Sequence, residues 1–238
     1  RGACIAMDPN TGKILAMATK GDFDPNSYTS LPDSVKEEIQ KLPEDEQGAA
    51  TTQAQYDMWR NKAISDPYEP GSVFKIITLA AALDSNTSTI GDRFTCIGYE
   101  NVADRKISCW KTFGHGEQSL AEAVQNSCNP AFIRIGFNMG IENFQNYFEA
   151  FGLTEKTDID LPGEAASIYH TKMTEMNLAS SSFGQTFKVT PIQLISAVSA
   201  AVNGGDLYKP YLVEKVISAD GSIVEEYEPT LVRQVISE

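Results

Sequence analysis

Apolar residues gather along the chain in runs of two kinds, helical and extended. The strongest helical runs are residues 72–84 and 191–202, which are densely apolar and end at polar or glycine residues. Weaker helical patterns cover residues 32–42, 52–64, 132–140 and 141–151. A further helix begins at Leu120 and should end at or before Asn129, because Pro130 follows.

Extended apolar runs that flank turn residues predict three β-hairpins. The paired runs are residues 3–7 with 13–19, 94–98 with 106–110, and 211–219 with 222–227. The first pair is apolar on both strand faces, which fits a sheet that is covered on both sides. Between the helices and hairpins, residues 20–32 are typical of a polar loop, and the charged run 43–47 is typical of a solvated surface.

Length and charge narrow the possible functions. The 238 residues suffice for one large domain or two small ones. The formal net charge of −13 argues against nucleic acid or an anionic membrane as the main partner. No apolar run approaches the length of a transmembrane helix. Because Arg1 and Gly2 lead directly into an extended run, we expect the chain to begin at a cut domain boundary, with any membrane anchor upstream.

The cysteines and histidines do not have the spacing of a metal site. The four cysteines stand at positions 4, 96, 109 and 128 without a Cys-x-x-Cys pair, and the two histidines are His115 and His170. We therefore expect no metal ion and no cofactor. Disulfides are permitted, but buried free thiols that act as small apolar side chains are the simpler alternative.

The stretch 68–75, Tyr-Glu-Pro-Gly-Ser-Val-Phe-Lys, has the features of a nucleophile site. Pro70 and Gly71 interrupt the chain immediately before Ser72, and a helical run follows. On a helix, Ser72 and Lys75 share one face, because they are three residues apart. A lysine whose pKa is lowered by burial can take the serine proton, and a helix N-terminus favours negative charge on the attacked carbonyl oxygen.

The Ser-x-x-Lys spacing by itself has low specificity, since about one match is expected by chance in a chain of this length. Ser108 and Lys111 form a second match within an extended run, where residues three apart face opposite sides. That match has neither the preceding Pro-Gly break nor the following helix of Ser72. An N-cap serine beside a solvated lysine is the alternative interpretation of Ser72 and Lys75.

A Ser-x-Asn triplet, Ser127-Cys128-Asn129, stands at the end of the helix that starts at Leu120. Its hydroxyl can pass a proton between a lysine and a leaving amine, and its amide can bind both a peptide-like substrate and the lysine. Taken alone, the triplet also fits a simple helix C-cap. Combined with Ser-x-x-Lys, it supplies two of the three motifs of penicillin-binding proteins and serine β-lactamases.

Longer stretches resemble the transpeptidase domain of class B penicillin-binding proteins. The resemblance covers nearly the whole chain and is closest to the sporulation and division type of Gram-positive bacteria. It is carried by the hairpin 2–17, the stretch 68–75, the loop Gly114-His115-Gly116, and residues 127–132, 157–164, 183–185 and 189–193.

The resemblance implies an α/β (α+β) fold of the penicillin-binding protein and serine β-lactamase type, here its helical lobe plus the first β-hairpin. It also implies peptidoglycan cross-linking through an acyl-enzyme. By position, Ser72 is the nucleophile, Lys75 the general base, Ser127 the proton relay, and Asn129 the residue that positions substrate and lysine. The Ser72 backbone N–H is one oxyanion donor.

Ligands and location follow from the same resemblance. Peptidoglycan stem peptides are the implied substrates, and β-lactam antibiotics, which mimic them, are the implied inhibitors. A glycosyltransferase is the implied partner in the cell-wall machinery. The implied location is outside the cytoplasm, with the full-length protein anchored to the cell membrane.

The family's third motif, Lys-Thr/Ser-Gly on an edge strand, does not occur in the sequence. Residues 111–114, Lys-Thr-Phe-Gly, resemble it only superficially. We therefore expect residues 1–238 to be a partial transpeptidase domain without the last strands of its main sheet, the pedestal domain or the membrane anchor. We expect this fragment to be inactive alone, and the unpaired sheet edge along residues 2–7 to favour self-association, strand swapping or disorder.

Two other functions fit part of the sequence. A serine β-lactamase needs a group that activates a deacylating water. Glu164 falls in the right interval, but it belongs to a Leu-Pro-Gly-Glu turn typical of the transpeptidases. A non-catalytic scaffold or sensor with the same fold suits a partial domain, although the intact set Ser72, Lys75, Ser127 and Asn129 argues against it for the parent protein.

Cys109 and Cys128 suggest redox control. Cys128 lies inside the Ser-x-Asn triplet, and Cys109 ends the extended run that leads into the loop 114–116. In an extracytoplasmic protein, disulfides persist. We hypothesise that pairing of these two thiols distorts Ser127 and Asn129 and makes the activity redox-sensitive. Two unrelated thiols are the alternative.

Overall fold

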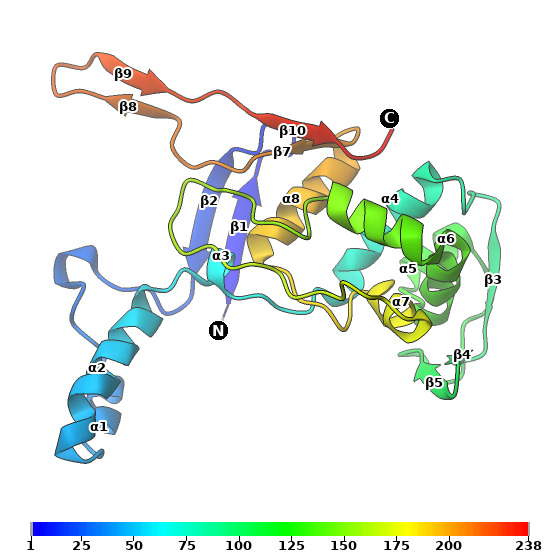
Figure 1. The fold of residues 1–238 in the computed structure, drawn as a ribbon, viewed down its shortest axis with the longest axis horizontal. Helices are drawn as coiled ribbons and strands as arrows, with labels where there is room; N and C mark the ends of the chain where they lie inside the picture. The colour runs from blue at the N-terminus through cyan, green and yellow to red at the C-terminus, as the bar shows by residue number, and fades with distance from the viewer. Residues whose placement is uncertain (1, 238) are drawn as a thin grey trace.

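Helices surround a central apolar core in the computed structural model, which describes residues 2–237 (Figure 1). The core joins four helices and the segments between them: α4 (Lys75–Asp84), α6 (Asn129–Ala150), α7 (Glu175–Ser181) and α8 (Pro191–Val202). The predicted helix 191–202 is confirmed. The predicted helix 72–84 is confirmed with one refinement, since its first turn is a separate 3₁₀ helix, η2 (Gly71–Phe74). Arg1 and Glu238 lie outside the described residues.

The predicted N-terminal hairpin forms from β1 (Ala3–Met7) and β2 (Ile14–Thr19), which pair antiparallel. A second, smaller core packs one face of the hairpin against α8 and the short helix α3 (Lys62–Ser65). The other face is open: the Leu15 side chain is 64% exposed. Among residues 2–237, therefore, only one face of this sheet is covered, and the prediction of a sheet covered on both sides does not hold there.

The helices that follow the hairpin differ in part from the predicted ones. After the 3₁₀ turn η1 (Pro25–Ser27), α1 (Asp33–Ile39) lies within the predicted range 32–42. The predicted helix 52–64 is wrong at both ends, because α2 (Glu44–Trp59) starts earlier and the separate α3 follows it. The acidic run that was predicted as a solvated surface forms the first turn of α2, where negative side chains stabilise the helix dipole.

The central strands pair differently from the sequence prediction. β3 (Arg93–Cys96) pairs with β6 (Gly116–Ser119), and β4 (Tyr99–Val102) pairs with β5 (Arg105–Ser108). The predicted hairpin of residues 94–98 with 106–110 is therefore wrong. Residues 99–102 had been assigned to its polar tip, and β6 reads Gly-Glu-Gln-Ser, which carries no strand preference.

Two helices meet at the Ser-x-Asn triplet. α5 (Leu120–Gln125) begins with a capping box of Ser119 and Glu122 and ends before residue 129, as predicted. α6 then starts at Asn129, which is the first residue of a new helix rather than a C-cap. The two predicted helices 132–140 and 141–151 are joined in α6, with a break at Gly140, whose φ is 76°.

The C-terminal residues form two pairs of strands. β7 (Asp206–Tyr208) pairs with β10 (Leu231–Gln234), and this pairing was not predicted. Between them, β8 (Lys215–Ile217) and β9 (Ile223–Glu226) form the predicted third hairpin, which extends away from the central helices (Figure 1). Among residues 2–237, no helix combines the length and the apolar character that a membrane span requires.

Candidate active site

A second segment of the chain fixes the turn that carries Ser72. The Gly71 N–H donates to the Gly184 carbonyl oxygen at 2.8 Å, and Tyr68 forms an antiparallel bridge with Val189. Gly184 has a φ of 85°, and a Cβ atom at this position would stand 2.0 Å from the Gly71 carbonyl oxygen. Only glycine permits this approach, so residues 183–185, which were singled out without a role, position the turn before Ser72.

Phe74 anchors the same turn by packing into the apolar core. Its side chain is 1% exposed and packs edge-to-face on Phe187, with ring centroids 4.7 Å apart. Phe144 and Phe148 complete the aromatic cluster. With Phe74 buried on one side, Ser72 remains exposed and Lys75 turns into the protein, where only 4% of it is exposed.

The structure brings the four predicted site residues together around the Lys75 ammonium group. Its Nζ donates to Ser127 Oγ at 2.9 Å, to the Ser127 carbonyl oxygen at 2.8 Å and to Asn129 Oδ1 at 2.8 Å. Ser72 Oγ lies 3.3 Å from Nζ, and Ser127 Oγ donates to Ser72 Oγ at 3.0 Å. The nucleophile candidate therefore contacts both a base candidate and a second hydroxyl.

Burial changes the acidity of this lysine. Desolvation lowers the pKa of Lys75 from 10.5 to about 8, and the nearby cysteines oppose this shift only in part. Within the described residues, Lys75 forms no salt bridge to a carboxylate that would hold it charged. The neutral amine is consequently accessible near neutral pH, and a neutral amine can accept the Ser72 proton.

The loop between α5 and α6 presents Ser127 and Asn129. Ser127 has a φ of 48°, a left-handed conformation that costs energy for a residue with a side chain. The indole N–H of Trp110 donates to the Asn126 carbonyl oxygen at 2.9 Å and supports the loop from outside. Cys128, which is fully buried, supports it from inside. The strained turn thus aims one hydroxyl and one amide at Lys75.

Comparison with known proteins assigns the family. The family described as the penicillin binding protein transpeptidase domain matches residues 2–238. The chain belongs to this family. A similar curated relative is Stage V sporulation protein D of Bacillus subtilis, which is 41% identical over 98% of the chain and 33% of the relative. Peptidoglycan D,D-transpeptidase PbpA of Mycolicibacterium smegmatis is 30% identical over the whole chain and 48% of the relative.

Solved structures agree with the family's fold. The D,D-transpeptidase domain of a peptidoglycan glycosyltransferase from Eggerthella lenta superposes with a TM-score of 0.83 at 27% identity, over 99% of the chain and 57% of that structure. The imipenem acyl-enzyme complex of penicillin-binding protein A from M. tuberculosis has a TM-score of 0.80 at 28% identity, over 100% and 54%. The chain spans about a third to a half of the length of the curated relatives it matches.

Glu164 and the second Ser-x-x-Lys match lie outside the cluster around Lys75. The Glu164 carboxylate accepts hydrogen bonds from the Thr157 N–H and hydroxyl, at 2.8 and 2.7 Å, and from the Asp158 N–H at 3.1 Å. It therefore closes the turn of its own loop. Ser108 and Lys111 are exposed, and the contact of this pair with the cluster is a long one from Asn129 Nδ2 to the Ser108 backbone carbonyl, at 3.5 Å.

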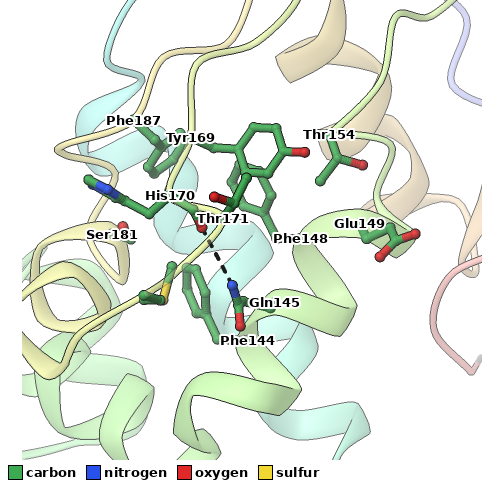
Figure 2. Close-up of a pocket in the computed structure, with 11 residues that line it drawn as sticks. Phe144, Gln145, Phe148, Glu149, Thr154, Tyr169, His170, Thr171, Ser181 and Phe187 are labelled. Atoms are coloured by element: carbon green, nitrogen blue, oxygen red, sulfur yellow. Dashed lines mark hydrogen bonds between the residues drawn. The ribbon is translucent and has the colours of Figure 1, made fainter.

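A pocket of about 270 Å³ opens between α6 and the segment 169–173, but none of the four site residues lines it (Figure 2). Its walls are the aromatic rings of Phe144, Phe148 and Tyr169, and Gln145 donates to the His170 carbonyl oxygen at 3.4 Å across its floor. Three rings that line the pocket also contact Phe74: Phe144, Phe148 and Phe187.

The structure contains a cluster of metal-ligating side chains next to the Ser-x-Asn triplet that the spacing of cysteines in the sequence did not predict. Cys109 and Cys128 are free thiols, and the structure brings both together with Cys96 and His115. Their ligand atoms all lie within 4.8 Å of one another. The prediction of no metal site rested on spacing along the chain, whereas these residues come from four separate segments.

Proposed function

We propose that this chain carries the acylation machinery of a serine-type peptidoglycan D,D-transpeptidase, with Ser72 as the nucleophile. The observation that supports this most directly is the buried Lys75, whose Nζ lies within hydrogen-bond distance of both Ser72 Oγ and Ser127 Oγ. The names of the relatives, peptidoglycan D,D-transpeptidases and β-lactam acyl-enzymes among them, point to the same reaction.

In the first half of the proposed reaction, neutral Lys75 takes the Ser72 hydroxyl proton as Oγ bonds to the carbonyl carbon of the D-Ala-D-Ala amide. The Ser72 N–H stabilises the oxyanion. The amide C–N bond then breaks, and the proton passes from Lys75 through Ser127 Oγ to the departing D-alanine amine. Ser127 suits this relay because its Oγ is 2.9 Å from the lysine and 3.0 Å from Ser72 Oγ.

In the second half, an amine from a neighbouring stem peptide attacks the acyl-enzyme carbonyl. The amine loses one proton through Ser127 to Lys75, and Ser72 recovers its proton as the acyl–oxygen bond breaks. Asn129 has a positioning function here. Its Oδ1 accepts a hydrogen bond from Lys75, and its Nδ2 makes only a long contact to the Ser108 carbonyl oxygen, at 3.5 Å. That amide N–H₂ can bind the substrate backbone.

The proposed ligands are stem peptides and β-lactams, and the proposed setting is extracytoplasmic, with a membrane anchor in the full-length protein and a glycosyltransferase partner. The similarity to Stage V sporulation protein D supports a role in sporulation. The sequence contains no Lys-Thr/Ser-Gly triplet. A polypeptide of residues 1–238 alone is therefore proposed to acylate slowly, because the group that binds the substrate carboxylate is absent from it.

Labelling with a fluorescent penicillin tests the proposal in the full-length protein that contains this chain. We expect a lasting label that peptide mass spectrometry maps to Ser72 and that Ser72→Ala abolishes. Ser108→Ala, in the second Ser-x-x-Lys match, serves as the matched control and keeps the label. Rapid loss of the label would identify a β-lactamase, and no label would identify a non-catalytic scaffold or sensor. Either result would overturn the proposal.

We also propose that Cys109 and Cys128 form a redox pair. Both thiols are buried, and their sulfur atoms lie within 4.8 Å of each other. Pairing would pull on Cys128, which stands between Ser127 and Asn129. Loss of labelling under oxidising conditions, with recovery on reduction, is the expected result, and labelling that does not respond to oxidant would contradict it.

A further inference from the structure

Four metal-ligating side chains converge from separate segments behind the active-site loop. Cys96 ends β3, Cys109 follows β5, His115 precedes β6, and Cys128 is the N-cap of α6. The three cysteines are buried and His115 is half-buried. The ligand atoms all lie within 4.8 Å of one another, and Cys109 Sγ is 3.7 Å from His115 Nδ1.

Backbone and side-chain N–H groups lie beside two of the sulfur atoms. The backbone N–H groups of Gly98 and His115 are directed at Cys96 Sγ. At Cys128, burial raises the pKa of the free thiol to about 12, although the backbone N–H of Ala131 and the Gln118 carboxamide are directed at its Sγ. N–H groups that point at sulfur stabilise negative charge on it.

Two polar atoms at this cluster lack a conventional partner. Gln118 is 2% exposed, and its Nε2 has no well-formed hydrogen bond among residues 2–237; the buried Nε2 of His115 has none either. Unpartnered buried polar atoms cost free energy and require an explanation. A bound cation that converts the neighbouring thiols to thiolates would supply a charged acceptor beside Gln118.

We propose that Cys96, Cys109, Cys128 and His115 bind one Zn²⁺ ion in a closed tetrahedral site. Three cysteines and one histidine are a ligand set typical of structural zinc. At a Zn–S distance of about 2.3 Å, tetrahedral ligands stand about 3.8 Å apart, so the cluster contracts by at most about 1 Å. The three thiols release three protons as they bind, and no oxidation or reduction takes place. The ion therefore binds only the reduced form of the chain, in which the proposed Cys109–Cys128 disulfide is open.

The proposed ion holds the active-site loop without touching substrate. Cys128 is flanked by Ser127 and Asn129, and its sulfur would be bound to segments that belong to the β3–β6 sheet and the loop after β5. Zinc would thereby help to maintain the left-handed turn at Ser127. Because all four positions are filled by protein, no site for a metal-bound water remains. This inference does not depend on the proposed transpeptidase activity.

Cobalt substitution tests the site in the reduced chain of residues 1–238. Titration with Co²⁺ alone should produce the thiolate-to-metal charge-transfer band and the intense visible bands of tetrahedral cobalt, which saturate at one ion per chain. Zn²⁺ should displace the cobalt and raise the thermal unfolding midpoint. Cys96→Ser and His115→Gln should weaken cobalt binding at least tenfold. Cys4→Ser changes an exposed cysteine outside the cluster and should bind as the unaltered chain does.

Counting the reactive thiols distinguishes a zinc site from a disulfide bond. In the reduced apo chain, all four cysteines should react with a thiol reagent after unfolding, and zinc should slow the modification of three in the folded chain. Absence of the cobalt bands, or bands that persist unchanged in both cluster variants, would overturn the proposal. So would isolation of the reduced, folded chain with no zinc-dependent change in thiol reactivity or unfolding midpoint.

Discussion

Lys75 shows how burial lowers the pKa of an ordinarily charged side chain into the range that the proposed base requires. An exposed lysine has a pKa near 10.4, so only about 0.04% of it is neutral at pH 7. At the value of about 8 that burial gives Lys75, about a tenth is neutral. Four acceptor oxygens surround Nζ, including Ser72 Oγ, and none of them belongs to a carboxylate. The site therefore orients the amine without locking it in the charged form.

The pH dependence of acylation follows from this pKa. In the proposed reaction the neutral amine is the base, so the rate of Ser72 labelling should rise about tenfold per pH unit below about pH 8 and level off above it. Stopped-flow measurement with a fluorescent penicillin in the full-length protein gives the profile. Lys75→Arg should abolish the reaction across this range, since arginine stays charged. A profile that is flat from about pH 6 to about pH 9 would exclude Lys75 as the base.

A substitution at Gly184 tests whether the close contact between Gly184 and Gly71 affects the rate at which Ser72 is acylated. Gly184→Ala places a Cβ atom 2.0 Å from the Gly71 carbonyl oxygen, so the turn must shift. We expect labelling to slow at least tenfold, because small displacements of a nucleophile are costly. Gly163→Ala is the matched control: its φ of 87° imposes the same backbone strain, but no atom lies within 4 Å of the added Cβ. Equal rates in the two variants would contradict the assignment.

Among the secondary-structure elements, α4 depends on the aromatic anchor at its N-terminus. Phe74→Ala removes a ring that contacts Phe144, Phe148 and Phe187, and it should lower the free energy of unfolding by about 3–5 kcal/mol. The neighbouring Val73 is 50% exposed, and Val73→Ala should cost less than about 1 kcal/mol. Urea denaturation of the two variants provides the comparison. Similar midpoints would mean that the aromatic cluster does not hold the turn.

The sequence predicted best where local pattern and tertiary packing agree. The helix 191–202 has apolar periodicity, a Thr190–Gln193 capping box and proline in its first turn, and its bounds were predicted correctly. β6 was not predicted because it consists of one glycine and three polar residues, and only the tertiary pairing with β3 makes it a strand. α2 was predicted short because its first turn is charged and the helix buries no residue, which leaves little apolar periodicity to detect.

In the candidate site too, the sequence predicted the local contacts but not those between distant segments. Ser72 and Lys75 are neighbours on one helical turn, so their spacing alone predicted their contact. Ser127 and Asn129 lie more than fifty positions further along the chain, and family resemblance was needed to add them. The Gly71–Gly184 contact and the Cys96–His115 part of the sulfur cluster depend on how separate segments meet. No local pattern in the sequence reports that juxtaposition.

For the molecule as a whole, the N-terminal hairpin leaves one sheet edge free. β1 pairs with β2 alone, and its other edge makes no backbone hydrogen bond among residues 2–237. The Lys20 N–H donates to the Gly2 carbonyl oxygen, so the alternation of an antiparallel ladder directs the N–H groups of Ala3 and Ile5 to the free edge. The exposed face beside it, which includes Leu15, is apolar. Such an edge is a template for another strand.

We predict that the isolated chain of residues 1–238 forms a dimer through antiparallel pairing of β1 with β1 of a second copy. The net charge of −13 opposes association, so the dimer fraction should increase with protein concentration and with salt, which screens the repulsion. Light scattering coupled to size exclusion measures it. Ala3→Pro removes an outward N–H at the first strand position, where proline is tolerated, and should restore the monomer without disturbing the β1–β2 ladder.

Leu15→Ser distinguishes edge pairing from adhesion of the apolar face. It removes apolar surface on β2 but leaves the β1 edge unchanged, so a dimer held by backbone hydrogen bonds should persist in this variant. If Leu15→Ser gives monomers while Ala3→Pro does not, the contact is face to face and the predicted strand pairing is wrong. If the unaltered chain stays monomeric at high concentration and high salt, the repulsion between copies or the twist of the short hairpin suffices to protect its edge.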